Sequence, residues 1–464
     1  MSSPAPPRVL LIACYELGHA PLGIAWPLAF LRRAGLDAET LDLAVEPFSS
    51  ARAAAADIVV ISVPMHTALR LGVQAAQRVR AANPRAHVSF HGLYAWLNAD
   101  SLLEGPADSI VAGECEDALV DLVRALGEGR AAAGVPGVST RASPAAPLRA
   151  RLSFPVPDRT TLPPPARYAG YHHDGDTDAA AYVEASRGCL HLCRHCPVVP
   201  IYGGRFFVVP AETVLADIRA QVATGARHVT FGDPDFLNGP GHALDVARRL
   251  HAEWPSLTFD FTAKVEHLLK HRRLLPEFAT LGCTFVVSAV ESLSDVVLLR
   301  LDKGHTAADV EELLAMMDAA GIVLHPTLVA FTPWTTLDDY IATIELFRAH
   351  GLVAYVPPVQ LAIRLLVPPH SALLADPDAA SWVGPLDRES FTHRWTHPDP
   401  RMDALFERVA ARVEAAEDAG EDPRRTWDAV RALAYEAADR PQPAEAMPPA
   451  FRPDPPRLTE HWFC

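Results

Sequence analysis

No stretch of this chain reaches the roughly 20 consecutive apolar residues that a membrane-spanning helix needs. The first apolar run, residues 9–14, is too short for the hydrophobic part of a secretory signal, and Glu16 follows it closely. Basic residues are in the minority: 41 Lys and Arg face 56 Asp and Glu, which gives a net charge of −15. Because phosphate binding needs a basic surface, nucleic acid is not expected as a partner. These absences predict a cytoplasmic protein that does not bind a membrane.

Cysteine is scarce as well, with seven in 464 residues. In a cytoplasmic protein, cysteines are more often metal ligands or reactive groups than disulfide partners. Cys14 and Cys283 lie in apolar segments, and Cys115 precedes an amphipathic helical pattern. We expect these three side chains to pack in the core.

The length indicates two or three domains, and the hydrophobic pattern separates them. Residues 1–126 alternate short apolar strands with amphipathic helices, which predicts a parallel, doubly wound (Rossmann-like) α/β domain. Residues 127–180 are rich in Pro and Ala and are expected to form a linker. Six further βα units over residues 181–370 predict a partial (β/α)6 TIM-type barrel. A helical region is expected over 371–440, followed by a proline-rich tail over 441–464 that ends in a cysteine.

The segment RGCLHLCRHCP follows the first barrel strand and contains Cys189, Cys193 and Cys196 with the spacing C-x3-C-x2-C. Three thiolates this close can share one metal centre, and sulfur ligands select zinc, copper(I) or iron–sulfur clusters. A structural zinc site would need a fourth ligand, for which His191 and His195 are candidates. A [4Fe–4S] cluster with one iron open to an external ligand is the other interpretation.

This segment, on the first loop of a partial barrel, resembles the radical S-adenosylmethionine (SAM) superfamily. The resemblance implies that the three cysteines hold a [4Fe–4S] cluster whose free iron binds the amino and carboxylate groups of SAM. It further implies that an electron from the cluster cleaves SAM. A reducing partner such as ferredoxin or flavodoxin and a small-molecule substrate are then required.

Residues 230–236 (TFGDPDF) occupy the place of the Gly-Gly-Glu-like motif of that superfamily, at the end of the second barrel strand. By this resemblance, Gly232, Asp233 and Asp235 bind the SAM amino group. An Asp-Pro turn that merely ends the strand is the alternative. Lys264, at the end of the third strand, is a candidate partner of the SAM carboxylate, with an ordinary surface lysine as the alternative.

Residues 288–306 (SAVESLSDVVLLRLDKGHT) resemble a stretch after the fourth strand in the B12-type branch of the superfamily. The resemblance directs Ser288 and Glu291 to the SAM ribose or carboxylate. The same branch carries a doubly wound, cobalamin-binding-type domain before the barrel, with a GE-x-E segment that VAGECEDALVDL matches.

Cobalamin itself is a separate expectation, because the D-x-H-x-x-G signature of its histidine-ligated form is absent. His19 lies on the corresponding loop with different neighbours, and His66 either lines the same cleft or caps the following helix. The alternative is a domain that binds substrate or only packs against the barrel. The leading function is therefore a radical SAM enzyme acting on a small molecule. The alternatives are a cobalamin-dependent radical SAM methyltransferase and a non-catalytic metal-binding or sensor protein.

Four segments, ISVPMHT, HGLYAWLN, CRHCPVVPIYGGRF and LVPPHSALL, also resemble a narrower group, the radical SAM proteins with a CUAEP or CCAEP tail, where U is selenocysteine. The resemblance implies that Cys464 is a catalytic thiol on a tether. It also implies a truncation, in which a UGA selenocysteine codon after Cys464 is read as stop.

Overall fold

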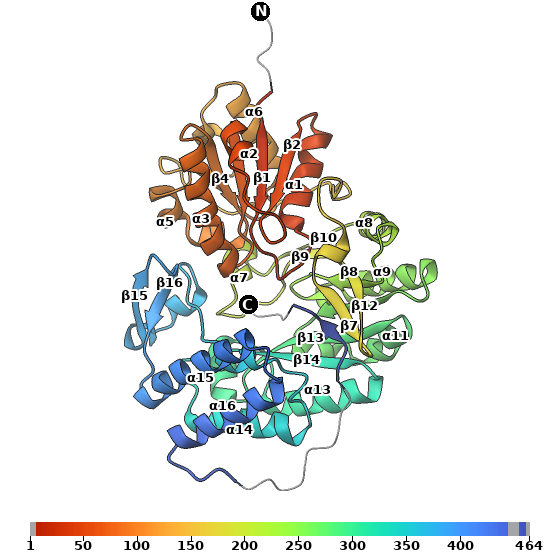
Figure 1. The fold of residues 1–464 in the computed structure, drawn as a ribbon, viewed down its shortest axis with the longest axis vertical. Coiled ribbons are helices and arrows are strands. Elements are labelled where there is room, and N and C mark those ends of the chain that lie inside the picture. Colours follow the sequence, from red (N-terminus) through yellow and green to blue (C-terminus); the bar gives the residue numbers. More distant parts are fainter. Residues whose placement is uncertain (1–5, 444–453, 461–464) are drawn as a thin grey trace, which may run out of the picture.

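The computed structural model describes residues 6–443 and 454–460, and Figure 1 shows two α/β units stacked along the long axis of the molecule. The N-terminal unit (red to orange) forms the upper part of the view, and the barrel with the C-terminal helices forms the lower part. The described part of the chain contains no helix long and apolar enough to cross a membrane.

The N-terminal domain is built on a six-stranded sheet in the order β2-β1-β3-β4-β5-β6. The first five strands are parallel, and the short β6 pairs antiparallel to β5. The strands are β1 (Val9–Ala13), β2 (Ala38–Asp42), β3 (Ile58–Ser62), β4 (His87–His91), β5 (Ser109–Val111) and β6 (Val138–Ser139). The helices are α1 (Leu22–Arg33), α2 (Ser50–Ala55), α3 (His66–Ala82), α4 (Leu93–Leu97), α5 (Ala99–Glu104), α6 (Glu116–Gly127) and the 3-10 turn η1 (Ala132–Gly134).

Strand β1 shows why this sequence forms such a sheet. It reads VLLIA and is buried along its whole length, as expected for a parallel strand that helices cover on both faces. Alternate side chains enter different cores: Val9 and Leu11 belong to the cluster that contains α1 and α6, whereas Leu10 and Ile12 belong to the cluster that contains α3. The strand runs from the N-terminus at the top of Figure 1 toward the barrel, so the carboxyl ends of the parallel strands face the second domain.

The barrel is an open, seven-stranded sheet in the order β14-β13-β12-β11-β8-β7-β17, in which β8 and β11 to β14 are parallel. Its strands are β7 (Gly170–His173), β8 (Asp176–Val183), β11 (His228–Phe231), β12 (Thr258–Thr262), β13 (Cys283–Glu291), β14 (Val323–Leu328) and β17 (Arg457–Leu458). A small separate pair, β9 (Ser186–Gly188) and β10 (Phe206–Val208), flanks the cysteine segment.

Helices and 3-10 turns surround this sheet. They are α7 (Val198–Tyr202), α8 (Ala211–Ala223), η3 (Phe236–Asn238), α9 (Pro240–Glu253), α10 (Val265–Lys270), η4 (Arg272–Leu274), α11 (Leu275–Thr280), α12 (Asp295–Leu301), α13 (Ala307–Ala320) and α14 (Leu337–Ala349). Capping boxes begin the last two: Thr306 with Asp309 in α13, and Thr336 with Asp339 in α14.

Two segments differ from the sequence expectation. Residues 127–180, expected as a linker, contain η2 (Pro165–Arg167) and the antiparallel β7–β8 hairpin, which extends the barrel sheet at its first strand. The sixth barrel strand is reduced to one bridge between Phe331 and Arg364. Prolines explain this reduction, because Pro357 and Pro358 lack the N–H that a sheet ladder needs, and the chain forms η5 (Pro358–Ala362) there instead.

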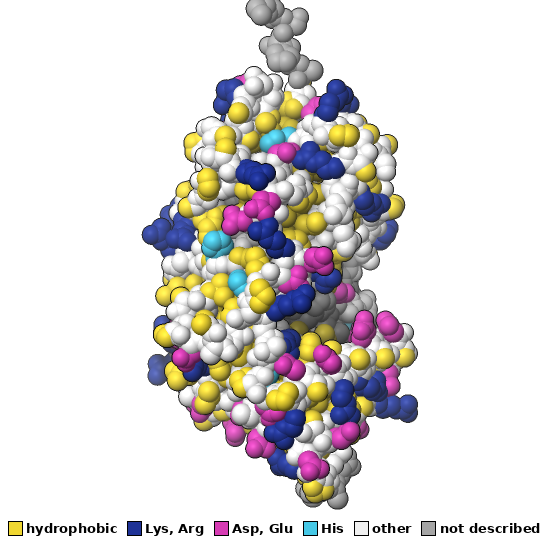
Figure 2. Space-filling view, turned by 90° about the vertical axis from the view of Figure 1, so that its left-hand side faces the viewer, with side chains coloured by type: hydrophobic (Ala, Val, Ile, Leu, Met, Phe, Trp, Pro, Cys, Tyr) yellow, Lys and Arg dark blue, Asp and Glu magenta, His cyan; other side chains and the backbone are white. Residues whose placement is uncertain are grey.

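The C-terminal region is helical, as expected, but begins with η6 (Ala372–Ala375), η7 (Ala379–Ser381) and a hairpin of β15 (Val383–Asp387) and β16 (Thr392–Trp395). Helices α15 (Pro400–Asp418) and α16 (Pro423–Ala437) follow and pack on each other. Figure 2 shows acidic and basic side chains interspersed over one face of the molecule, along both the upper and the lower half.

The described part of the tail, residues 454–460, brings the two edges of the barrel sheet together. β17 pairs antiparallel with β7 at one edge. The carbonyl oxygen of Pro456 lies 2.8 Å from Nε2 of His325, which belongs to β14 at the other edge. Beyond β17, the hydroxyl of Tyr15 donates a 2.5 Å hydrogen bond to Oε1 of Glu460, so the tail also contacts the N-terminal domain.

Candidate active site between the two domains

A cavity of about 240 Å³ lies between the two domains. The N-terminal domain lines it with residues at the carboxyl ends of its parallel strands, and the barrel lines it from β8, β9, α7 and the loop after β11. Residues of the lining that matter below are Met65, Glu116, Tyr182, Glu184, Arg187, Tyr202 and Gly232. In both sheet types ligands bind at these strand ends, so the cavity joins two candidate binding edges.

The cysteine segment begins directly after β9, beside this cavity. Gly188 precedes it with a φ of +77°, and a Cβ there would lie 2.4 Å from the carbonyl oxygen of Arg205, so only glycine fits. The backbone N–H of Cys196 donates to the carbonyl oxygen of Cys193 at 3.1 Å, and Cys189 packs on the same apolar cluster as Cys196. The structure thus brings the three predicted cluster cysteines together on one short, tightly turned loop.

Burial and a neighbouring cysteine change the pKa of two of these thiols. Burial raises the pKa of Cys189 to about 11 and that of Cys196 to about 12, and the neighbouring Cys193 raises both. A metal centre must displace these protons, because thiolates are the ligands. One ring nitrogen of each histidine proposed for a zinc site has a partner outside the cysteines: Nε2 of His195 lies 3.2 Å from Glu291 Oε1, and Nε2 of His191 lies 3.1 Å from Nε2 of His267. Nδ1 of His195 is buried without a hydrogen-bond partner among the described residues.

Lys303 is a charged residue of this site that the sequence analysis did not single out. Its ammonium is buried and lies 3.1 Å from Glu291 Oε1, and its charge also acts on Cys193. Although burial opposes ionisation, Lys303 and then His195 lower the pKa of Glu291 to about 2. The available signal was the position of Lys303 inside residues 288–306, the stretch in which the resemblance gives roles to Ser288 and Glu291 only.

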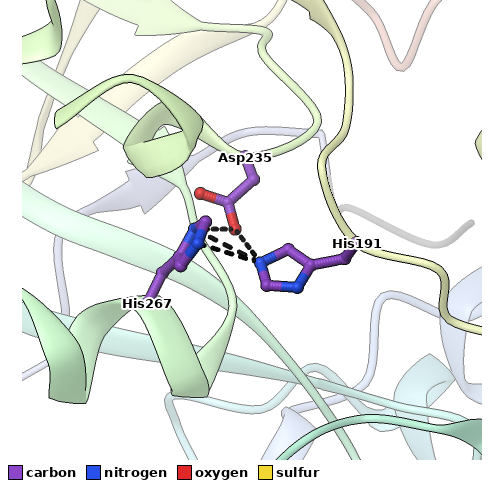
Figure 3. A group of neighbouring side chains, drawn as sticks. All are labelled: His191, Asp235 and His267. Carbon is purple, nitrogen blue, oxygen red and sulfur yellow. Dashed lines mark hydrogen bonds and ion pairs between the residues drawn. The ribbon is translucent and has the colours of Figure 1, made fainter. Parts of the chain in front are cut away.

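The three residues predicted to bind the SAM amino group occupy different positions. Gly232 lines the cavity, and a Cβ there would lie 2.3 Å from the ring of Tyr182. The Asp233 carboxylate accepts hydrogen bonds from the Ala185 N–H (2.9 Å) and the Ser186 hydroxyl (2.6 Å). Burial raises the pKa of Asp233 to about 7. Asp235 lies close to His191 and His267, as Figure 3 shows.

Lys264 and Ser288, the other candidate SAM contacts, are both buried. The ammonium of Lys264 lies 3.1 Å from Glu266 Oε2, so it is not an ordinary surface lysine. The hydroxyl of Ser288 on β13 has no hydrogen-bond partner among the described residues. An unpaired buried hydroxyl is costly, so this position suits a ligand that supplies the missing bond.

The two histidines proposed for the cobalamin cleft have different surroundings. His19 stacks on Tyr182 of the barrel, with ring centroids 4.2 Å apart and an interplanar angle of 3°. Burial lowers the pKa of His19 to about 3, so its imidazole is neutral. Nε2 of His66 lies 2.6 Å from the carbonyl oxygen of Ser390 in the β15–β16 hairpin, while the neighbouring Met65 lines the cavity.

A buried charge cluster at the domain interface also escaped the sequence analysis. Arg187 lies 2.6 Å from Glu116 and 3.1 Å from Glu184, and 3.8 Å from Glu114. The Tyr202 hydroxyl donates to Glu114 Oε1 at 2.9 Å. One arginine thus faces three carboxyl groups. The Oε2 atoms of Glu114 and Glu116 are buried without a hydrogen-bond partner in the described structure. Of the two, Glu116 lines the cavity, so its unpaired oxygen can accept a hydrogen bond from a ligand there.

The protonation of Glu114 gives a testable pH dependence. Burial raises its pKa to about 7 from 4.5, against the charge of Arg187. Between these values the folded state keeps a proton that the unfolded state has lost, so stability falls as the pH rises through this window. We expect the free energy of unfolding of the unsubstituted protein to fall by about 1–3 kcal/mol between pH 5 and pH 8, and Glu114→Gln to remove this fall. Urea unfolding at both pH values measures it. The exposed Glu311→Gln is the control, and equal pH slopes for Glu114→Gln and the unsubstituted protein would contradict the expectation.

Comparison with known proteins identifies the class. Residues 183–347 match the radical SAM superfamily, and residues 8–123 match the B12 binding domain. The chain therefore contains a radical SAM domain preceded by a B12 binding domain. Members of this superfamily are enzymes, and its domain implies a [4Fe–4S] cluster and SAM as cofactors, while the B12 binding domain supports cobalamin.

Two named relatives are similar to part of this chain. Hopanoid C-3 methylase of Methylococcus capsulatus is 24% identical over 337 residues, which are 71% of this chain and 64% of that protein. Ribosomal protein uS12 methylthiotransferase RimO of Geobacter sulfurreducens is 27% identical over 173 residues, 34% of this chain and 38% of that protein. This chain thus spans less than two thirds of the length of either relative.

Solved structures share the fold. The cobalamin-dependent SAM radical enzyme OxsB with aqua-cobalamin bound superimposes with a TM-score of 0.72 at 16% identity, covering 89% of this chain and 67% of that one. The radical SAM methyltransferase TsrM from Kitasatospora setae gives a TM-score of 0.59 at 18% identity, covering 74% and 71%. The predicted fold class, a doubly wound B12-type domain followed by a partial radical SAM barrel and helices, is confirmed.

Proposed function

We propose that this protein is a radical SAM enzyme that modifies a small-molecule substrate in the cavity between its two domains. One observation carries the proposal: the three-cysteine loop of the radical SAM domain opens beside a cavity whose other wall is the ligand-binding edge of the B12 binding domain. Both domains therefore present their cofactor-binding edges to the same space.

The donor set of the loop fits a [4Fe–4S] cluster. Cys189, Cys193 and Cys196 offer three sulfur ligands and leave one iron position for SAM. When bound, the cluster supplies the electron that cleaves SAM. Lys303 holds a positive charge beside two of these ligands and keeps Glu291 ionised.

The SAM contacts are assigned to buried polar side chains near the cysteine loop. The unpaired Ser288 hydroxyl and the Glu291 carboxylate can bond the ribose hydroxyls, and the ammonium of Lys264 can bind the SAM carboxylate. Lys264 and Glu291 then share SAM with their present partners, Glu266 and Lys303. Gly232 keeps the backbone open at the cavity wall. The carboxylate of Asp233 is occupied by Ala185 and Ser186, so we assign it the task of holding the strand that leads to the cysteine loop.

Cobalamin dependence and methyl transfer form the second candidate function. The unpaired carboxyl oxygen of Glu116, which lines the cavity, fits the amide groups at the rim of a corrin, which are hydrogen-bond donors. The names of two relatives, a hopanoid C-3 methylase and a radical SAM methyltransferase, favour methyl transfer. His19 supplies a neutral ring in the interface, where it supports the barrel through Tyr182 rather than through charge.

Contacts of the tail support a more specific proposal about Cys464. Cys464 lies outside the described residues, but Glu460 bonds Tyr15, and its side chain packs against Gly18, on the loop after β1. The last described residue of the tail thus lies at the loop after β1, which supports a role in catalysis for Cys464, the role that the resemblance to the CUAEP or CCAEP group implies. Sequencing the gene beyond the codon for Cys464 tests the selenocysteine proposal, which requires UGA followed by codons for Ala, Glu and Pro. A reducing partner of the ferredoxin or flavodoxin type and a cytoplasmic location belong to the same proposal.

Product analysis tests the function. The protein is reconstituted anaerobically with iron and sulfide, supplied with cobalamin, and incubated with SAM and a reductant. Formation of 5′-deoxyadenosine supports the radical SAM proposal, and additional S-adenosylhomocysteine supports methyl transfer. Methylthioadenosine would instead indicate transfer of the aminocarboxypropyl group. Absence of any SAM cleavage by a cluster-loaded protein would overturn the proposal in favour of a metal-binding or sensor protein.

A further inference from the structure

Three metal-binding side chains that do not belong to the cysteine set meet next to it (Figure 3). His191 comes from the cysteine loop, Asp235 from the loop after β11, and His267 from α10 after β12. One ligand atom of each lies within 4.8 Å of the other two. The group therefore forms at the carboxyl ends of the barrel strands, where barrel enzymes place their reactive groups.

The distances between the ligand atoms match those around a single metal ion. Nδ1 of His267 lies 2.9 Å from Asp235 Oδ2, and Nε2 of His191 lies 3.8 Å from the same oxygen. Nε2 of His191 lies 3.4 Å from Nδ1 of His267, the same His267 atom that faces Asp235. With metal–ligand bonds of about 2.0–2.1 Å, neighbouring ligands lie about 3.0–3.4 Å apart. Shifts of a few tenths of an ångström would therefore complete the site.

Burial and charge favour a cation at this position. Asp235 is fully buried and His267 nearly so, and a buried carboxylate needs a positive partner. The nearby ammonium of Lys264 is already paired with Glu266. A single proton can join two of the three groups, whereas a metal ion bonds all three at once.

The carboxylate is also oriented for this purpose. Its Oδ1 atom accepts the Leu237 N–H at 2.9 Å, and its Oδ2 atom accepts the Lys264 N–H at 3.1 Å. Such outer hydrogen bonds fix ligating carboxylates in metal sites. They come from the loops after β11 and β12, so the geometry of the group depends on the rigid strand ends.

We propose that His191, Asp235 and His267 bind a divalent first-row metal ion, such as zinc or iron(II), in a site separate from the three cysteines. Two imidazoles and one carboxylate are the ligand set that such ions accept. Three protein ligands leave coordination positions for water or for an oxygen ligand on a bound small molecule.

Zinc binding to a cluster-free protein tests this site independently of the radical SAM function. The full-length chain with Cys189, Cys193 and Cys196 all replaced by alanine is titrated with zinc against a chromophoric chelator. We expect one zinc per chain. X-ray absorption should show nitrogen and oxygen neighbours at about 2.0–2.1 Å and no sulfur at about 2.3 Å.

Two further substitutions in the same background identify the ligands. His267→Gln and Asp235→Asn, the second of which keeps the hydrogen bond to Leu237, should each weaken zinc binding by about 100-fold or more. His271→Gln is the matched control, because this histidine lies on the same segment with its ring centroid 5.7 Å from that of His267. Zinc affinity equal in His267→Gln and its parent, or no zinc bound by the parent, would overturn the proposal.

The cluster-loaded protein with its natural cysteines provides a second measurement that does not rely on the triple substitution. Zinc content after exposure to zinc and gel filtration should be one per chain, in addition to the iron of the cluster. His267→Gln should lose the zinc and keep the iron. If His267→Gln loses neither zinc nor iron, or if zinc is bound through sulfur only, the proposed site is contradicted.

Discussion

Replacing Cys193 with alanine should abolish the [4Fe–4S] cluster and reduce the rate of SAM cleavage by at least about 10³-fold. Cys193 is the most buried of the three loop cysteines, and the Cys193→Ala protein would offer the cluster only two sulfur ligands. Iron and sulfide content, the electron paramagnetic resonance signal of the reduced cluster and 5′-deoxyadenosine formation measure the effect.

The matched control is Cys283→Ala. Cys283 is equally buried, but it lies at the start of β13, at the opposite end of that strand from Glu291. Its substitution should cost a little stability through a small cavity and leave the iron content unchanged. A Cys193→Ala protein that keeps the cluster signal and cleaves SAM would refute the assignment of the loop.

The second large effect is expected for Lys303→Met. The substitution leaves the Glu291 carboxylate buried without its ammonium partner, and breaking a buried ion pair in this way costs about 3–5 kcal/mol. Urea unfolding of the cluster-free protein at pH 7 measures the loss. His195 remains 3.2 Å from Glu291, so the carboxylate keeps one hydrogen-bond partner and part of the loss should be recovered.

The pH profile and a double substitution check the cause. In the unsubstituted protein the pKa of Glu291 is lowered to about 2 from 4.5, so its contribution to stability is present above pH 4.5 and is lost as the pH falls toward 2. Lys303→Met should flatten this acid dependence. Adding Glu291→Gln to Lys303→Met removes the unpaired charge and should restore at least half of the lost stability. A loss below about 1 kcal/mol for Lys303→Met alone would contradict the ion-pair account.

Local sequence signals were sufficient for the two α/β units and for the cysteine loop. The period of the apolar residues predicted the parallel strands and the helices between them but not the β7–β8 hairpin, and the spacing of Cys189, Cys193 and Cys196 is contained in eight residues. Pro357 and Pro358 prevent the last expected strand from forming in full. Because they lack N–H groups, only one bridge forms there.

The charged interior could not be predicted in the same way, because its partners are far apart in the sequence. Arg187 meets Glu116 across 71 residues, and Tyr202 meets Glu114 across 88. Lys303 lies only 12 residues from Glu291, but no local pattern shows that its ammonium is buried against this carboxylate. Asp233 was assigned to SAM from its place in a motif, yet both of its oxygens bond the segment that leads to the cysteine loop.

The tail strand has a consequence for the order of folding. The N–H of Gly170 bonds Thr459, 289 residues further along the chain, whereas the other barrel strands pair with near neighbours in the sequence. Closing so long a loop is entropically costly, and contacts of high sequence separation form slowly. We therefore expect residues 454–460 to dock after the parallel strands have paired, so that the interior of the barrel stays accessible to cofactors until a late step of folding.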